Sequence, residues 1–337
     1  MRGSLRVVVV GGTGYTGAEA LRLLAGHPGA VVVGATSERQ AGRPVRESCP
    51  WLASDLILEP FDPAKIDADV IFLCQDNGFA MQHIDALVRC GRVIDFAADF
   101  RLRDADTYAD WYGRPHVAPH WLNDAVYGLV ELTDAAQLRA AQVVANPGCY
   151  PTACLLALLP LVRVGLVEGL PIIDAKSGVS GAGRSRTETD YLFTEVTGGF
   201  RAYGVERHRH TPEIAQALGR PVRFVPHLIP ATRGIHATIH VPVGAGVTTE
   251  QIHDVWRETY AGRPFVRVVN FWPSTKHVQG GNSAFLRASV DPETGLATLV
   301  SVIDNLVKGA AGQAIQNMNV MFDLPEATGL PVGGVWP

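Results

Sequence analysis

The sequence predicts an α/β protein in which a Rossmann-type doubly wound parallel sheet precedes an α+β domain with a mixed sheet. Three observations predict this class. An apolar, β-branched run at residues 5–10 leads into a glycine-rich turn and a helix, as at the start of a dinucleotide-binding unit. Strand and helix patterns then alternate up to residue 148, which is typical of parallel βαβ units. Beyond residue 149, loops rich in Gly and Pro separate the strands, and the length of 337 residues suits two domains.

The turn after the first strand has the spacing of a phosphate-binding loop. Gly12, Gly14 and Gly17 fit G-x-G-x-x-G, in which the glycines permit a tight turn, close approach to a pyrophosphate and close packing of helix on strand. The helix N-terminus adds N–H donors for the phosphates. We therefore expect dinucleotide binding rather than a purely structural turn. The expected cofactor-binding residues of this loop are Gly11, Gly12, Thr13, Gly14, Tyr15, Thr16 and Gly17.

The end of the second strand, residues 31–35, bears on which dinucleotide is bound. An acidic residue at this place accepts the ribose 2′-OH of NAD. Ser37 and Arg39 instead offer a hydroxyl and a guanidinium to the 2′-phosphate of NADP, so we prefer NADP. Glu38 favours NAD if its side chain points into the site. A solvated, charged turn without a ligand is the alternative to both.

The remaining strand and helix patterns place the domain boundary. Apolar runs at residues 69–74 and 93–96 flank a helical pattern at residues 79–89, which continues the parallel sheet. We expect a nucleotide-binding domain at residues 1–148, completed by the C-terminal segment 305–337, whose residues 305–321 form a long helix. A catalytic and dimerisation domain at residues 149–304 follows. Its expected strands lie at residues 171–176, 222–229 and 234–241, and its expected helix at residues 248–260.

Cys149 stands between a short apolar strand, residues 142–145, and a long apolar helix. Unpaired N–H groups and the positive end of the helix dipole favour a thiolate at such a helix start. Pro151 suits a first helical turn because its missing N–H is not needed there. Cys149 is thus a candidate nucleophile, and the alternative is a small buried apolar side chain.

Two imidazoles, His208 and His210, stand just before a helix expected to begin near Pro212. One of them can act as a general acid or base near neutral pH. We favour His210, because Glu213 can orient its ring, and assign substrate binding to His208. No metal site is expected, since H-x-H lacks a third ligand at the spacing of a zinc site. His236 and His240 alternate with apolar residues and receive no role.

The segment 177–184 follows a strand and combines glycines, hydroxyls and one guanidinium. This composition suits an anionic group, so Ser177, Gly178 and Arg184 are candidate substrate-binding residues. A flexible loop without a ligand is the alternative.

Composition and charge indicate which partners and which cellular compartment to expect. The net charge of −4 and the pI of about 6.3 come without a basic patch, so no nucleic-acid partner is expected. The five cysteines (Cys49, Cys74, Cys90, Cys149 and Cys154) are odd in number and scattered, which favours a reducing compartment. The N-terminal apolar segment is too short for a signal peptide. The apolar run at residues 153–162 is interrupted by Pro160 and closed by Arg163, so it is not expected to span a bilayer. We expect a cytoplasmic protein without a membrane partner.

Several motifs in order resemble the N-acetyl-gamma-glutamyl-phosphate reductase family of arginine biosynthesis, whose relatives include aspartate-semialdehyde dehydrogenase. The resemblance runs nearly end to end. Its motifs are the glycine loop, residues 99–102, 127–129, 146–152, 176–184, 208–213, 233–235 and 304–309.

This resemblance implies an activity and a set of site residues. The implied reaction is the NADPH-dependent reduction of an acyl phosphate to an aldehyde through a Cys149 thioester, with release of inorganic phosphate. The family's acid/base histidine falls on the His208/His210 pair. Its cofactor contacts, for NADP(H), fall on the glycine loop, Ser37, Arg39 and Asn319. We expect a homodimer or homotetramer.

Some residues depart from the usual pattern of this family, and other classes of protein share some of its features. The family usually shows Leu-Pro-His where this chain has residues 75–77, and Arg where it has Glu38. A short-chain dehydrogenase needs Tyr-x-x-x-Lys, and no tyrosine here has a lysine four residues on. A non-enzymatic NADP-sensing module has no use for Cys149 beside a histidine pair. An aspartate-semialdehyde dehydrogenase and a lysine-pathway aminoadipyl-phosphate reductase stay as alternatives, although the latter typically has Asn-Ala where this chain has Tyr150-Pro151.

Overall fold

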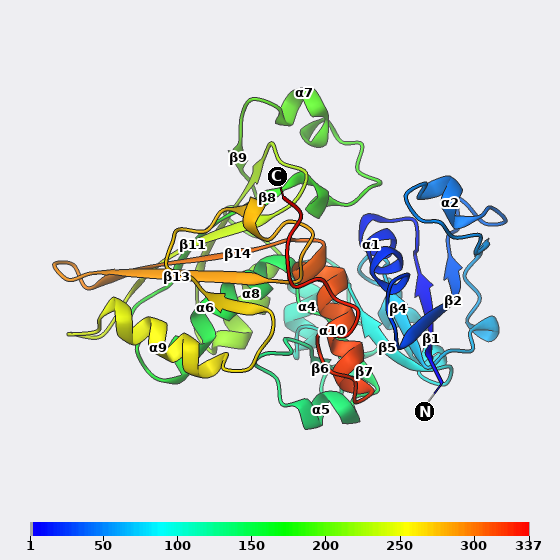
Figure 1. Ribbon diagram of the computed structural model, residues 1–337, viewed down its shortest axis with the longest axis horizontal. Coiled ribbons are helices and arrows are strands. Elements are labelled where there is room, and N and C mark those ends of the chain that lie inside the picture. The colour runs from blue at the N-terminus through cyan, green and yellow to red at the C-terminus, as the bar shows by residue number, and fades with distance from the viewer. Residues whose placement is uncertain (1–2, 337) are drawn as a thin grey trace. The chain divides into compact units, whose positions relative to one another are not determined.

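The computed structural model describes residues 3–336, and the chain forms two compact units. The first comprises Met1–Gly148 and Ala310–Leu330, and the second comprises Cys149–Gly309 and Pro331–Pro337. Each unit is built around its own seven-stranded sheet. The elements of both units are labelled in Figure 1.

The sheet of the first unit is parallel throughout and has the strand order β3-β2-β1-β4-β5-β7-β6. This order confirms the predicted doubly wound sheet, because the chain leaves β1 first toward β2 and later toward β4. Its strands are β1 (Leu5–Val10), β2 (Ala30–Thr36), β3 (Leu58–Glu59), β4 (Val70–Leu73), β5 (Arg92–Asp95), β6 (Val126–Tyr127) and β7 (Val143–Ala145).

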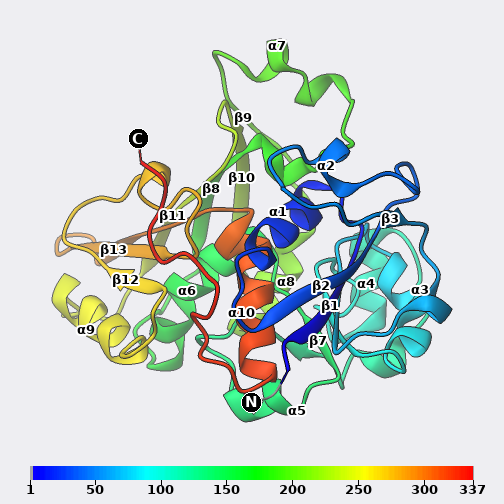
Figure 2. The same ribbon diagram turned by 45° about the vertical axis from the view of Figure 1, so that its right-hand side comes forward.

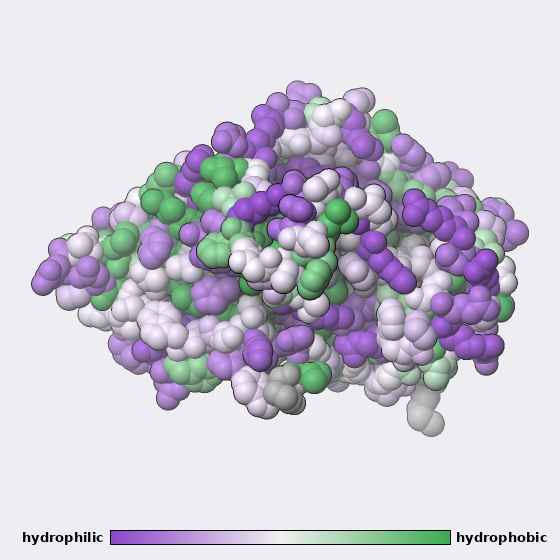
Figure 3. Space-filling view, turned by 90° about the horizontal axis from the view of Figure 1, so that it is seen from above, coloured by the Kyte–Doolittle hydropathy of each residue, from purple (hydrophilic) through white to green (hydrophobic). Residues whose placement is uncertain are grey.

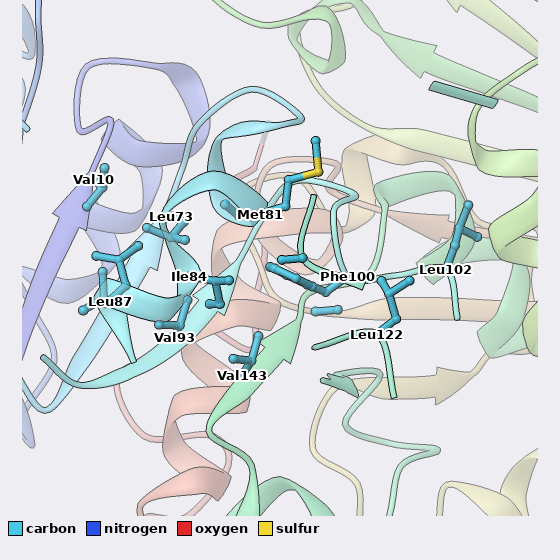
Figure 4. Packing of buried hydrophobic residues seen from close by; sticks show 14 of the residues in the cluster. Val10, Leu73, Met81, Ile84, Leu87, Val93, Phe100, Leu102, Leu122 and Val143 are labelled. Carbon is cyan, nitrogen blue, oxygen red and sulfur yellow. The ribbon is translucent and has the colours of Figure 1, made fainter. Parts of the chain in front are cut away.

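Helices cover this sheet and bury its apolar residues. Val10 of β1, Leu73 of β4, Val93 of β5 and Val143 of β7 meet Ile84 of a covering helix in one core, which Figure 4 shows from close by. A strand that is buried on both faces can be apolar at every position, and this explains the continuous apolar runs in the sequence. The helices are α1 (Tyr15–Leu24), α2 (Val45–Ser48), α3 (Phe79–Leu87), α4 (Ala105–Tyr112), α5 (Ala135–Ala140) and α10 (Gly312–Met321).

The second unit has a mixed sheet with the strand order β12-β13-β14-β11-β8-β10-β9, as predicted for an α+β domain. The β8/β10 and β12/β13 pairs are parallel, and the other neighbours are antiparallel. Its strands are β8 (Ile172–Gly178), β9 (Arg201–Ala202), β10 (Arg223–Ile229), β11 (Ile235–Pro242), β12 (Val266–Val268), β13 (Ala284–Asp291) and β14 (Leu296–Ile303). Its helices are α6 (Cys149–Arg163), α7 (Phe193–Val196), α8 (His210–Leu218) and α9 (Thr249–Thr259).

Helix α6 continues through Pro160 although proline lacks a backbone N–H. The carbonyl that this N–H would have bonded belongs to Leu156. It accepts a hydrogen bond of 2.6 Å from the hydroxyl of Tyr260 instead. A side chain that follows α9 thus satisfies the helix where proline cannot, and the apolar run is one helix rather than two.

The C-terminal helix predicted for residues 305–321 is divided in the structure. A π-helical turn at Val307–Ala311 precedes α10. The side chain of Asp304 accepts the N–H groups of Leu306 and Val307, at 2.8 and 3.2 Å. The backbone N–H of Gly309 donates to the Asp304 carbonyl at 2.9 Å, five residues back. This wider spacing is the hydrogen-bond pattern of a π-turn, which is frequent at functional sites.

A long excursion joins β8 to β9 and contains α7. Figure 2 shows this segment standing away from the sheet of its own unit. Phe193 and Phe200 on it are 80% and 68% exposed. On the face drawn in Figure 3, hydrophilic residues are widespread and hydrophobic ones form small groups. Within residues 3–336, no helix is long and apolar enough to cross a membrane.

Candidate active site

Cys149 is the first residue of α6, directly after the loop that follows β7. The residue is partly exposed, and it is not in a disulfide. A Cβ atom placed on Gly309 would lie 2.8 Å from the Cβ of Cys149. Only glycine therefore allows the π-turn to pack against Cys149.

The loop before Cys149 is held by side chains of the first unit. The Nε of Arg101 donates to the Asn146 carbonyl at 2.8 Å, and its Nη2 donates to the Phe96 carbonyl at 2.6 Å. The amide of Asn146 donates to the Ala310 carbonyl at 3.1 Å. Arg101 and Asn146 are both buried, so the hydrogen bonds to Arg101 and to the Ala310 carbonyl together fix the position of this loop.

Cys154 provides a contrast within the same helix. It is fully buried, and burial raises the pKa of its thiol. A thiol that stays protonated is a poor nucleophile. Of the two cysteines on α6, only Cys149 has the partial exposure that a reaction requires.

Tyr150, the residue next to Cys149, is the centre of an aromatic and polar cluster. Its hydroxyl donates to the His227 carbonyl at 3.2 Å and accepts from the hydroxyl of Tyr203 at 3.3 Å. Its ring contacts those of His208 and His210 edge-on, with centroids 5.9 and 5.8 Å apart. Burial raises the pKa of the Tyr150 hydroxyl, which therefore acts as a neutral hydrogen-bonding group.

The two histidines lie together, with ring centroids 5.0 Å apart. Helix α8 begins at His210 rather than near Pro212, so the predicted start is wrong. Proline is accepted within a first helical turn because its N–H is not needed there. His210 itself is therefore on the helix, where the backbone fixes its direction.

The environment of His208 sets its protonation. Burial, followed by the charge of Arg209, lowers the pKa of His208 to about 4. The backbone N–H of His210 donates to its Nδ1 at 3.1 Å. Nδ1 is thus an acceptor, and the proton of the neutral ring is on Nε2, which can donate a hydrogen bond.

The loop that follows β8 is held close to a second loop, residues 231–234. The N–H of Gly178 donates to the Gly234 carbonyl at 2.9 Å, and a Cβ on Gly178 would lie 2.8 Å from the Arg233 nitrogen. Asn305 joins the two loops: it accepts the Gly234 N–H at 2.7 Å and donates to the Ser180 hydroxyl at 2.9 Å.

The predicted substrate-binding residues of this loop differ in their surroundings. Ser177 is buried, and its hydroxyl donates to the Gly178 carbonyl at 3.0 Å. Arg184 is exposed and lies farther along the chain, after Gly183. Their role in substrate binding stays a prediction.

The glycine loop of the first unit has the geometry that a dinucleotide requires. Gly11 has a φ of +87°, and a Cβ there would collide with the Cys74 carbonyl. A Cβ on Gly17 would collide with the Gly11 carbonyl. Helix α1 starts at Tyr15 without a side-chain cap, so its N-terminus is open to phosphate oxygens. The residues present therefore fit a dinucleotide.

The three residues after β2 differ in whether another part of the protein binds their side chains. The Ser37 hydroxyl lies 3.0 Å from that of Thr13 in the glycine loop. The Glu38 carboxylate accepts the backbone N–H of Phe61 at 2.9 Å, so it is bound to the neighbouring loop. Arg39 is exposed and makes no hydrogen bond or ion pair with any residue in the range 3–336. Its guanidinium is available to a 2′-phosphate.

Asn319 is buried in α10, away from solvent. Its Oδ1 lies 2.9 Å from the Nε2 of His27. Its Nδ2 donates to the carbonyls of Glu326 and Thr328 at 3.1 and 2.9 Å. The cofactor contact expected for Asn319 stays a prediction, and the contacts seen here connect α10 to the segment after it.

Sequence reasoning missed Tyr203 and Asn305 as parts of the site. Tyr203 reaches Tyr150 from the end of β9, a strand of two residues without a sequence pattern. Asn305 stands in a family motif, but its contact with Gly234 depends on the tertiary fold. No cluster of three or more His, Cys, Asp or Glu in residues 3–336 can hold a metal ion.

Family models match both units. Residues 6–141 match the family described as "Semialdehyde dehydrogenase, NAD binding domain", and residues 149–305 match "Semialdehyde dehydrogenase, dimerisation domain". An aspartate semialdehyde dehydrogenase II from Vibrio cholerae, solved as a complex, has a TM-score of 0.73 at 17% identity and covers 96% of this chain and 99% of its own. One from Candida albicans, solved with NADP, has a TM-score of 0.68 at 15% identity, with coverages of 95% and 98%. These structures show the fold.

The two family models together place the chain in the semialdehyde dehydrogenase class. Among its relatives, the N-acetyl-gamma-glutamyl-phosphate reductase of Symbiobacterium thermophilum is 50% identical. The similarity covers 99% of this chain and 100% of that enzyme. The enzymes of the same name from Heliobacterium modesticaldum and Geotalea daltonii are 44% and 47% identical over 99% of this chain and 100% of their own. The chain belongs to the N-acetyl-gamma-glutamyl-phosphate reductase family.

Proposed function

We propose that this chain reduces N-acetyl-γ-glutamyl phosphate to N-acetylglutamate 5-semialdehyde with NADPH, with release of inorganic phosphate, as a cytoplasmic homodimer or homotetramer in arginine biosynthesis. The observation that supports this best is the partly exposed Cys149 at the start of α6, beside a cluster that contains two histidines. A family match over nearly the whole chain supplies the substrate class.

The chain's own residues provide covalent catalysis. The Sγ of Cys149 attacks the acyl carbon, a C–S bond forms, and the C–O bond to phosphate breaks so that phosphate leaves with the electron pair. When bound, NADPH would supply a hydride to the acyl carbon of the thioester, and an acid would donate a proton to the carbonyl oxygen, which gives a thiohemiacetal. Cys149 then departs as the C–S bond of the thiohemiacetal breaks and the aldehyde carbonyl forms. The thiolate is regenerated, and the hydroxyl proton passes to a base.

The two histidines are assigned separate roles in this scheme. With a pKa of about 4, His208 stays neutral at pH 7, and its Nε2–H is a fixed donor to a substrate oxygen. A donor that does not change charge suits binding better than proton transfer. We therefore retain His210 as the acid/base residue, on the first turn of α8.

The cofactor assignment depends on the residues after β2. Glu38 was the reason to favour NADH, but its carboxylate is bound to the Phe61 N–H. Ser37 and Arg39 are then the groups for the 2′-phosphate. We propose that they and the loop from Gly11 to Gly17 bind NADP(H), together with Asn319.

The reverse reaction tests this function. The purified protein is incubated with N-acetylglutamate semialdehyde, phosphate and either NADP or NAD, and the absorbance of the reduced cofactor is followed. We expect reduction that requires phosphate and is faster with NADP. The aldehydes of the aspartate and aminoadipate pathways are assayed in parallel. A faster reaction with either of them would reassign the substrate, and no reaction with any of the three would refute an acyl-phosphate reductase.

A further inference from the structure

The residues after β4 depart from the family, and the structure shows what most of them do. The Asn77 side chain accepts the N–H of Ala98 at 2.9 Å. The backbone carbonyl of Asn77 accepts a hydrogen bond from the guanidinium of Arg114 at 3.0 Å. Asp76 is exposed, and its backbone carbonyl accepts the N–H of Phe79 at 3.3 Å. The role of Gln75 is not explained by these contacts.

Gln75 lies beside the glycine loop at the place where the strand order reverses. Strands β1 and β4 are neighbours, with Val10 paired to Leu73, so Gly11 and Gln75 both follow the carboxyl ends of the central strands. A Cβ placed on Gly11 would lie 3.2 Å from the Nε2 of Gln75. In doubly wound sheets, ligands bind in the crevice outside the strand ends at this reversal.

The side-chain amide of Gln75 has no hydrogen-bond partner among the residues that the structure describes. It is only partly exposed, and nothing in residues 3–336 forms a hydrogen bond with it. A half-buried amide without a partner gives up contacts with water and gains none in return. A ligand in the crevice, next to Gly11, can provide the missing partner.

We infer that Gln75 is a cofactor-binding residue whose amide N–H donates to the diphosphate and to the ribose on its nicotinamide side, the part that NADH and NADPH share. The inference rests on the proposed function only in taking a nicotinamide dinucleotide as the ligand. The Leu that the family usually has at this position cannot make such a bond. Gln75 is thus distinct from Arg39, which faces the 2′-phosphate that NADPH alone possesses.

The test measures dissociation constants of NADPH and NADH by fluorescence titration of the purified full-length protein. The Gln75→Leu variant should bind both cofactors about tenfold more weakly, because it loses one hydrogen bond to a charged group. Gln75→Glu should lose more, since its carboxylate repels the diphosphate. Asp76→Ala is the matched control and should bind both cofactors as the wild type does.

A third ligand separates contact from a structural effect. Adenosine 2′-monophosphate lacks the diphosphate and the second ribose, so Gln75→Leu should bind it as tightly as the wild type. Equal dissociation constants for the dinucleotides in wild type and Gln75→Leu would overturn the inference. A loss confined to NADPH, or an equal loss for adenosine 2′-monophosphate, would overturn it as well. The proposed function fails separately, when a wild type that binds cofactor does not turn over any of the three aldehydes.

Discussion

Replacing His208 by Asn should change how the stability of this protein depends on pH. The pKa of His208 is about 4 in the folded protein, because burial and Arg209 disfavour the charged ring, against about 6.5 in an unfolded chain. Between these values the unfolded chain binds the proton and the folded protein does not. Stability is therefore lost progressively as the pH falls below about 6.5, and the loss is complete below about 4.

The size of this loss follows from the two pKa values. Between about pH 7 and about pH 5, proton binding to the unfolded chain should lower the free energy of unfolding by about 2 kcal/mol. Asn cannot be protonated in this range, and its side-chain oxygen can still accept the His210 N–H that Nδ1 accepts now. His208→Asn should thus lose about 2 kcal/mol less than the wild type over the same interval.

Urea unfolding at both pH values, followed by circular dichroism, measures the four free energies that are needed. Burial also lowers the pKa of His27, His116 and His253, and the comparison of two proteins removes their contribution. An NMR titration of the folded wild type gives a second check, with an expected midpoint for His208 near 4. Parallel losses in both proteins, or a midpoint near 6.5, would refute the proposed environment of His208.

The other predictions concern catalysis and cofactor choice. Cys149→Ser should abolish turnover and leave the dissociation constant of NADPH nearly unchanged, whereas Cys154→Ala should keep most of the rate; equal losses in kcat at both positions would place the nucleophile elsewhere. Arg39→Ala should weaken NADPH binding by a few kcal/mol at most and leave NADH nearly unaffected, and a wild type that prefers NADH in the same titration would contradict this. His210→Asn should lower kcat and flatten its pH profile, while His208→Asn should mainly raise KM; the opposite pattern would exchange the two roles.

The fold was predictable from the sequence because its signals are local. The buried parts of parallel strands, such as Val7–Val10 of β1 and the whole of β4, are continuous apolar runs, and glycine spacing marks the turn after β1. Strands β3, β6 and β9 have two residues each and show no periodic pattern. They exist because a neighbouring strand pairs with them, and a single sequence does not reveal this.

The placement of the candidate site residues was predictable in part, for the same reason. Cys149 at a helix start is a local feature, and so is the pair His208 and His210. The direction of the Glu38 side chain was not predictable, because its carboxylate binds the backbone N–H of Phe61, more than twenty residues away in the sequence. The protonation of His208 likewise depends on its burial, which no sequence pattern states.

The π-turn shows how a segment distant in the sequence completes the surroundings of Cys149. An ordinary helix after Asp304 would bond each N–H to the carbonyl four residues back, but Gly309 bonds five residues back, to the Asp304 carbonyl. The wider turn brings the Gly309 backbone against Cys149, where a Cβ would lie only 2.8 Å away. Asp304 and Gly309 therefore act together: the carboxylate and carbonyl of the first set the turn, and the missing side chain of the second admits the cysteine. The family motif at residues 304–309 has a physical explanation in this packing, although it lies far from Cys149 in the sequence.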